Sequence, residues 1–135
     1  MSKNKRTKYS VYNLNYHIVF VTKYRHKVLS GDIETYVKER IQNICEQYQW
    51  EQLALEVMPD HVHLFVSAPP KVAPLIIATT IKSILTVDVF NRFQGLKQSK
   101  FWGSGLFSRG CYYGSAGTVS SETIKKYIEN QKHDD

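Results

Sequence analysis

Cysteines, long apolar runs and, over the first part of the chain, acidic residues are scarce in this sequence of 135 residues. The two cysteines, Cys45 and Cys111, lie far apart and belong to no Cys-x-x-Cys pair, which favours two buried free thiols over a disulfide or a zinc knuckle. No stretch approaches the roughly 18 uncharged apolar residues of a membrane span, and no apolar signal segment follows the basic start. We therefore expect one domain over residues 1–135, cytoplasmic and without a membrane partner.

Acidic residues are absent from the first 31 positions, which carry seven lysines and arginines. Since the net charge of the whole chain is +6, the remainder has a net charge of −1. A basic end on a nearly neutral body favours a polyanion as partner, nucleic acid first. Residues 1–10 are expected to form a flexible basic tail, and for residues 1–8 the alternative is that the lysines only aid solubility. Further along, Lys23, Tyr24 and Arg25 interleave an aromatic ring with cations, which suits phosphates and stacked bases.

The apolar spacing predicts a simple order of elements. Period-two alternation indicates strands at residues 11–22, 52–58 and 61–67, and the turn Pro59-Asp60 makes the last two a hairpin. Helical spacing indicates helices over 33–48 and from Pro74 to about residue 89. Five of the seven glycines lie between residues 103 and 117, which predicts a mobile loop leading into a fourth strand around 106–115. Ser120 or Ser121 then caps a last helix.

This order of strands and helices is typical of an α+β fold, the ferredoxin-like βαββαβ sandwich, with an added C-terminal helix. One face of such an antiparallel sheet carries the helices. The other face can take a ligand or a second subunit. The fold hosts many functions and therefore decides none of them.

Two histidines stand at the head of the third strand, in the stretch EVMPDHVHLFVSA. His61 and His63 are two residues apart, so both imidazoles point to the same face of the sheet. Two imidazoles fixed on rigid backbone form half of a site for a divalent transition metal. The alternative is a pair of polar residues on a solvated strand face, and a His-x-His pattern alone does not exclude it.

The last helix supplies partners for such a site. Tyr127 and Gln131 are spaced i, i+4 and share a stripe with Ile124 and Ile128, so this face is expected to point inward. An inward tyrosine beside isoleucines is usually a packing residue. An inward glutamine, however, needs a hydrogen-bond partner or a metal, and its carbonyl oxygen can serve as a ligand.

Taken together, these motifs resemble those of the single-tyrosine HUH transposases of small bacterial and archaeal insertion sequences. The resemblance rests on YHIVFVTKYRHKVL (16–29), EVMPDHVHLFVSAPP (56–70), the glycine-rich segment from Trp102, and SSETIKKYIENQ (120–131). It covers nearly the whole chain, and the order and spacing of these motifs are far more specific than His-x-His alone.

The resemblance implies that His61, His63 and Gln131 bind Mg²⁺ or Mn²⁺ and that Tyr127 is the catalytic nucleophile. It implies cleavage and rejoining of single-stranded DNA hairpins at element ends through a 5′-phosphotyrosine. It also implies a homodimer in which each active site is completed by the tyrosine helix of the other subunit. No Walker motif or dinucleotide fingerprint is present, so no nucleotide cofactor is expected. The residues expected to contact DNA are Lys23, Tyr24, Arg25, Lys82 and Trp102.

One segment departs from the family pattern. After Lys82, relatives tend to carry further basic residues, whereas this chain reads SILTVDVFNR, apolar and then acidic at Asp88. DNA contact at the second helix is therefore expected to be reduced or remodelled.

Two other functions compete with the transposase. A non-catalytic RNA-binding module of ferredoxin-like fold would suit the basic end and the 13% aromatic content, but it leaves the histidine pair unexplained. A hydrolase using a metal-bound water would retain cleavage after Tyr127→Phe.

Overall fold

The computed structural model of the protein describes residues 4–101, 105–115 and 129. A four-stranded antiparallel sheet has the order β4-β5-β3-β6 and consists of β3 (Asn15–Val21), β4 (Glu51–Met58), β5 (His61–Ser67) and β6 (Tyr112–Gly114). The helices are α1 (Gly31–Tyr48), α2 (Pro74–Arg92) and the short α3 (Leu96–Phe101). Together, the element order and the strand order confirm the ferredoxin-like βαββαβ sandwich.

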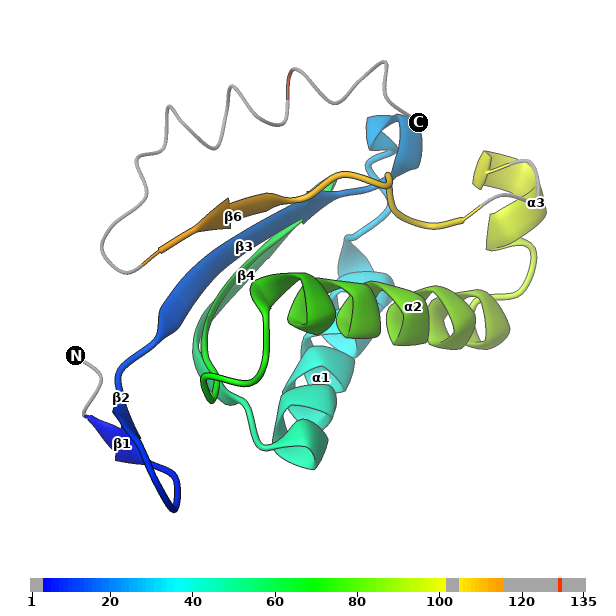
Figure 1. Ribbon diagram of the computed structural model, residues 1–135. Helices are drawn as coiled ribbons and strands as arrows, with labels where there is room; N and C mark the ends of the chain where they lie inside the picture. Colours follow the sequence, from blue (N-terminus) through cyan, green and yellow to red (C-terminus); the bar gives the residue numbers. More distant parts are fainter. Residues whose placement is uncertain (1–3, 102–104, 116–128, 130–135) are drawn as a thin grey trace.

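Helices α1 and α2 lie side by side against one face of the sheet (Figure 1). Alternation along the two central strands directs Ile18 and Phe20 of β3, and Val62 and Leu64 of β5, into the hydrophobic core. The intervening residues therefore belong to the opposite face of the sheet. That opposite face carries both histidines of β5.

Residues at the start of α2 and at the end of α1 explain where these two helices begin and end. Pro74 is the first residue of α2, where its missing N–H removes no intrahelical hydrogen bond. Helix α1 ends at Tyr48, and the next residue, Gln49, caps it in a left-handed conformation (φ 61°) and donates its N–H to the carbonyls of Cys45 and Glu46.

Helix α2 is long and apolar enough by composition to cross a membrane, and it is the one helix of the described residues that meets this description. Its residues Ile77, Ile81, Leu85 and Val89 are buried in the core beneath the sheet, which accounts for the apolar stripe. Asp88, the acidic departure noted above, accepts hydrogen bonds from Arg40 of α1 at 2.8 and 2.9 Å. This ion pair fastens the two helices to each other.

The N-terminal part of the chain differs from the sequence prediction. The strand expected over residues 11–22 is divided into β2 (Val11–Tyr12) and β3, and β2 pairs with β1 (Lys5–Arg6). In place of part of the expected flexible tail, the chain thus has a short hairpin, which extends away from the sheet (Figure 1). An ion pair between Lys5 and Glu51 connects this hairpin to β4.

The segment before β6 also differs from expectation. Helix α3 is present where no helix was expected, and the fourth strand spans three residues instead of about ten. Leu106 and Phe107 are buried in the core, and backbone hydrogen bonds join Lys23 to Leu106 (2.9 Å) and Ser108 to Val21 (3.0 Å). Residues 105–108 are therefore held by packing and by one isolated antiparallel bridge between Thr22 and Phe107, not by a continuous strand. Of the expected last helix only Glu129 is described, in helical conformation.

Candidate active site

The β4–β5 hairpin places the histidine pair. Its turn at Pro59-Asp60 directs the chain back along the sheet, so that His61 and His63 open β5 opposite Val21 and Val19 of β3. Both imidazoles are about five-sixths buried, with 16% of each side chain exposed. The sequence prediction that they share one face of a strand is confirmed.

Asp60 fixes the first histidine. Its Oδ1 lies 2.9 Å from Nδ1 of His61, so the carboxylate accepts the Nδ1–H hydrogen bond and leaves the lone pair on Nε2. The other oxygen of Asp60 lies 3.8 Å from Nε of Arg25. A carboxylate that accepts the Nδ1–H of an imidazole sets the tautomer in which Nε2 is free of a proton and can bind a metal.

The second histidine lies between two neighbours. Nδ1 of His63 is 3.5 Å from Oε1 of Glu56 on β4, and its Nε2 is 3.0 Å from Nδ1 of His17 on β3. Burial, and then the nearby imidazole of His17, lower the pKa of His63 below its usual value. The ring is therefore kept neutral at neutral pH, which is the form that binds a metal.

His17 is the site residue that sequence reasoning missed. It lies opposite Phe65 in the β3–β5 register and its ring stacks on that phenyl group, with centroids 4.2 Å apart and planes at 12°. Only 7% of His17 is exposed. Period-two alternation within NYHIVFV does put His17 on the face opposite the core, but its partner on β5 follows only from the strand register.

Whether this site can hold a divalent cation depends on the ligand atoms that it offers. The described residues contain no group of three or more His, Cys, Asp or Glu arranged to hold a metal. His61 and His63 supply two imidazoles, and the family resemblance implies the amide of Gln131 as the third ligand. Tyr127 and Gln131 both lie outside the described residues. The two imidazoles, each with Nδ1 facing a carboxylate, suit a borderline divalent cation that keeps open positions.

The basic corner follows β3 directly. Lys23, Tyr24 and Arg25 form a single 3-10 turn, η1 (Lys23–Arg25), in which Tyr24 and Arg25 have left-handed φ values of 59° and 54°. Tyr24 is 40% exposed, and Nζ of Lys23 lies 5.9 Å from the centre of its ring. Two adjacent left-handed residues other than glycine are costly, and such strain concentrates at functional sites. Trp102, the last residue expected to contact DNA, lies outside the described residues.

Lys82 makes contacts within the chain. Its Nζ donates hydrogen bonds to the carbonyls of Arg109 (3.3 Å) and Gly110 (3.2 Å), and burial lowers the pKa of its ammonium group. It thereby ties α2 to the segment that leads into β6. Its expected contact with DNA stays a prediction, and that contact would have to compete with these two hydrogen bonds.

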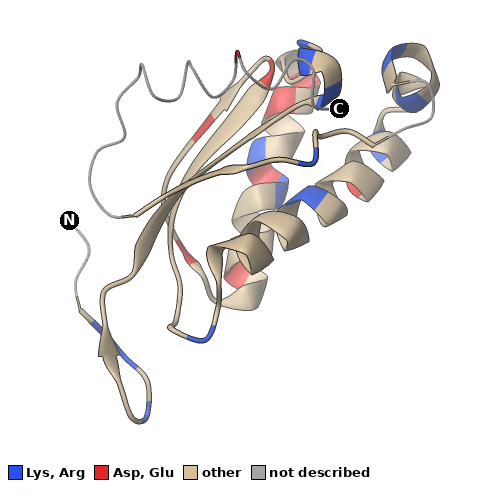
Figure 2. Ribbon diagram, turned by 45° about the horizontal axis from the view of Figure 1, so that its top comes forward, with Lys and Arg blue, Asp and Glu red and all other residues tan. Residues whose placement is uncertain are grey.

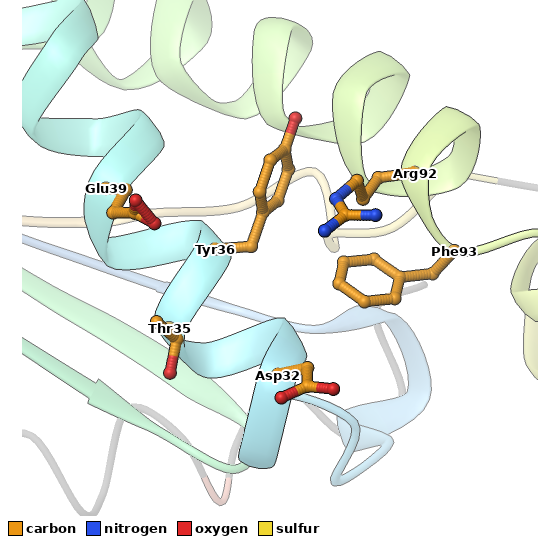
Figure 3. A pocket seen from close by; sticks show the side chains of 6 residues that line it. All are labelled: Asp32, Thr35, Tyr36, Glu39, Arg92 and Phe93. Atoms are coloured by element: carbon orange, nitrogen blue, oxygen red, sulfur yellow. The ribbon is translucent and has the colours of Figure 1, made fainter.

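A pocket of about 310 Å³ lies between the start of α1 and the end of α2 (Figure 3). It is lined by Asp32, Thr35, Tyr36, Glu39, Arg92 and Phe93. The guanidinium of Arg92 lies over the rings of Tyr36 and Phe93, at 5.9 and 5.7 Å. Because two carboxylates border the pocket and the helical layer separates it from the histidine face, we do not assign it to a polyanion.

The two cysteines are both free thiols. Cys45 is buried, as expected, whereas Cys111 is half-buried at the entry to β6. Burial raises the pKa of each thiol to about 11, so neither is a thiolate at neutral pH.

Comparison with known proteins identifies the class of protein that has this fold and this pair of histidines. Residues 10–131 match the family described as "Transposase IS200 like", and the chain belongs to this family. It is similar to the ISDra2 transposase TnpA of Deinococcus radiodurans, with 39% identity over 128 residues, 92% of this chain and 87% of the relative. The transposase for insertion sequence element IS200 of Salmonella typhimurium is 27% identical over 135 residues, 100% of this chain and 88% of the relative.

Solved structures agree with this assignment. A crystal structure of a putative transposase from Deinococcus radiodurans R1 matches with a TM-score of 0.82 and 37% identity, over 94% of this chain and 97% of that one. The REP-associated tyrosine transposase bound to a REP hairpin matches with a TM-score of 0.56 over 96% of this chain and 68% of that one. Because its identity is 15%, that second likeness shows the fold alone. The chain is thus a transposase, and the RNA-binding alternative is not favoured.

Proposed function

We propose that this transposase cleaves and rejoins single-stranded DNA at the ends of an insertion sequence, through a covalent bond to Tyr127. The observation that carries the proposal is the histidine pair with its two carboxylates. His61 and His63 each turn Nδ1 toward a carboxylate, at 2.9 and 3.5 Å, which leaves the lone pair of each imidazole on Nε2. Family membership supports the same reaction.

The chemistry requires a nucleophile, a charge-neutralising group and a substrate held in line. His61, His63 and Gln131 would hold Mg²⁺ or Mn²⁺, which when bound offsets negative charge on the scissile phosphate. The hydroxyl of Tyr127 attacks the phosphorus, the bond from phosphorus to the leaving 3′ oxygen breaks, the phenol loses its proton, and the 3′ oxygen takes up a proton. The products are a 5′-phosphotyrosine and a free 3′-hydroxyl.

This route conserves the energy of the broken bond. A 3′-hydroxyl from another DNA end can attack the phosphotyrosine and restore a phosphodiester with little net change in free energy. The phenol of a free tyrosine has a pKa near ~10, so Tyr127 must lose its proton during attack. The scheme needs no nucleotide cofactor.

The test of the proposal is adduct formation. The protein is incubated with a single-stranded hairpin from the ends of its element, with Mn²⁺ or with EDTA, and then denatured. A covalent protein–DNA species that requires Mn²⁺ and maps to Tyr127 by mass spectrometry is expected. Cleaved DNA without any covalent species would instead support the hydrolase, and binding without cleavage would support a non-catalytic module.

Hairpin DNA is proposed as the substrate on two grounds. One similar fold, the REP-associated tyrosine transposase, was solved bound to a REP hairpin. This chain also presents cations interleaved with aromatic rings, both at η1 and on the β1–β2 hairpin. On the β1–β2 hairpin, Figure 2 shows basic residues and no acidic one. Such surfaces bind phosphates through the cations and bases through the rings.

The β1–β2 hairpin should contribute to this binding. Tyr9, at its turn, is 86% exposed, and Nζ of Lys8 lies 5.2 Å from the centre of its ring. Replacing Lys8 with glutamine should remove about one phosphate contact, which lowers the slope of log affinity against log salt by about 0.7. The measurement is fluorescence anisotropy with a labelled hairpin at several salt concentrations.

Lys38→Gln is the matched control, since it removes one cation from α1, where Lys38 pairs with Glu34 at 2.9 Å. Its salt slope should equal that of the wild type. Equal slopes for Lys8→Gln and the wild type would show that the hairpin does not touch the DNA backbone.

We also propose that the active protein is a homodimer whose sites are completed in trans. In the helix that the sequence predicts, Tyr127 shares a face with Ile124 and Ile128, which would need an apolar surface, and a partner subunit can provide one. Edge strands that pair across a twofold axis would also cover exposed backbone groups.

A mixing experiment tests the trans arrangement. A subunit with His61→Ala and His63→Ala is combined with a Tyr127→Phe subunit and allowed to exchange. Sites built in trans place both lesions in one site and leave the other intact, so part of the wild-type activity should return. With heterodimers demonstrated by native mass spectrometry, an absence of recovered cleavage would establish sites built in cis.

A further inference from the structure

The contacts of His63 with Glu56 and His17 favour one position for its ring proton. Nδ1 of His63 faces the carboxylate of Glu56 at 3.5 Å, and a carboxylate can only accept, so the proton lies on Nδ1. The lone pair is then on Nε2. Since Nε2 lies 3.0 Å from Nδ1 of His17, His17 must be the donor of that hydrogen bond.

His17 is held firmly in this donating position. Its ring stacks on Phe65 at 4.2 Å between centroids, and the strand register sets it opposite that residue in the centre of the sheet. With 7% of the residue exposed, bulk water has little access to replace His17 as a partner of His63. His61 differs in this respect, because its contact with Asp60 uses Nδ1.

We propose that His17 is a built-in competitor for the metal, occupying through its Nδ1–H the Nε2 lone pair by which His63 would bind a divalent cation. The inference rests on the proposed function, which assigns His63 to the metal. A cation and His17 cannot share this lone pair, so cation binding breaks the hydrogen bond. His17 then tunes cation affinity without being a ligand, and it acts only through His63.

The expected change in cation affinity follows from the net free energy that one hydrogen bond contributes. Removing the competing donor should raise cation affinity roughly two- to tenfold. A third metal ligand in place of His17 would give the opposite sign, since its loss weakens binding. The sign of the change therefore separates a competitor from a ligand.

The experiment compares His17→Phe with the wild type. Phenylalanine keeps a ring that can stack on Phe65 and removes the N–H donor. Calorimetric titration with Mn²⁺, without DNA, should show affinity two- to tenfold tighter in the variant. Phe65→Leu is the control, because it alters the stack and leaves the donor in place, and its affinity should stay within about twofold of the wild type.

A second measurement uses the wild type alone, so the test does not depend on the folding of a variant. In metal-free protein, ¹⁵N spectra of the imidazoles should show His63 protonated on Nδ1 and His17 protonated on Nδ1. Titration with diamagnetic Mg²⁺ should shift the signals of His63 Nε2 and His17 Nδ1 together, with one dissociation constant. A His63 protonated on Nε2 would overturn the proposal.

The outcomes distinguish this inference from the proposed function. Unchanged or weaker Mn²⁺ affinity in His17→Phe, while the wild type binds Mn²⁺ and forms its DNA adduct, would overturn the role of His17 alone. A gain of the same size in Phe65→Leu would assign the effect to loosening of the sheet face and would also overturn it. Absence of Mn²⁺ binding in the wild type would overturn the metal-dependent function and the competition together.

Discussion

Tyr127→Phe should abolish the denaturant-resistant protein–DNA adduct while the protein still folds and binds hairpin DNA. The substitution keeps a ring that can pack with Ile124 and Ile128 and removes only the nucleophilic oxygen. Loss of the nucleophile from an active site whose residues act as a unit lowers turnover by on the order of 10³-fold or more, so no adduct should be detected. The measurements are denaturing gel electrophoresis for the adduct and anisotropy for DNA affinity.

Tyr113→Phe is the matched control for that experiment. Tyr113 lies on β6, and burial together with the neighbouring Cys111 raises the pKa of its phenol well above the usual range. Such a phenol loses its proton less readily than an ordinary tyrosine, so it is a poor nucleophile. Adduct formation should therefore match the wild type. An adduct that persists in Tyr127→Phe and maps to Tyr112 or Tyr113 would refute the assignment.

His61→Ala and His63→Ala should each remove metal-dependent cleavage and weaken Mn²⁺ binding by about 100-fold or more, since each deletes one donor of a three-ligand site. The fold should survive, because both rings lie on the sheet face opposite the core and the neighbouring core residues Val62 and Leu64 are unchanged. Calorimetry with Mn²⁺ and thermal unfolding measure the two effects separately.

His26→Phe is a suitable control for the histidine variants. His26 lies beyond η1, and its ring contacts Phe101 edge-on at 5.1 Å, a contact that phenylalanine can retain. This variant removes one imidazole outside the site and should leave Mn²⁺ affinity unchanged. Unaltered Mn²⁺ affinity in both His61→Ala and His63→Ala would show that neither residue is a ligand.

The sequence predicts the elements that depend on local signals. The turn Pro59-Asp60 and the alternation of HVHLFVS are enough to place His61 and His63 on one face of a hairpin, and the structure agrees. The β1–β2 hairpin was not foreseen. Its turn, closed by a hydrogen bond from the N–H of Thr7 to the carbonyl of Ser10 (2.8 Å), carries no Asn-Gly or Asp-Gly signal.

Contacts between distant segments are the part that the sequence could not predict. The pairing of His17 with His63 requires the register of β3 on β5, which neither strand encodes alone. Lys82 is expected from the family resemblance to contact DNA, and only the packed chain shows its hydrogen bonds to the carbonyls of residues 109 and 110. Tyr127, Gln131 and Trp102 stay predictions, because they lie outside the described residues.

The strand register also has a consequence for the order of folding. His61 and His63 belong to one hairpin, whose two strands meet through a tight turn and can pair within microseconds. His17 meets His63 across 46 residues of chain, and this contact requires closure of a long loop that contains α1. The histidine pair is thus assembled early by local structure. The contact between His17 and His63 forms only when the central strands dock, so it reports completion of the sheet.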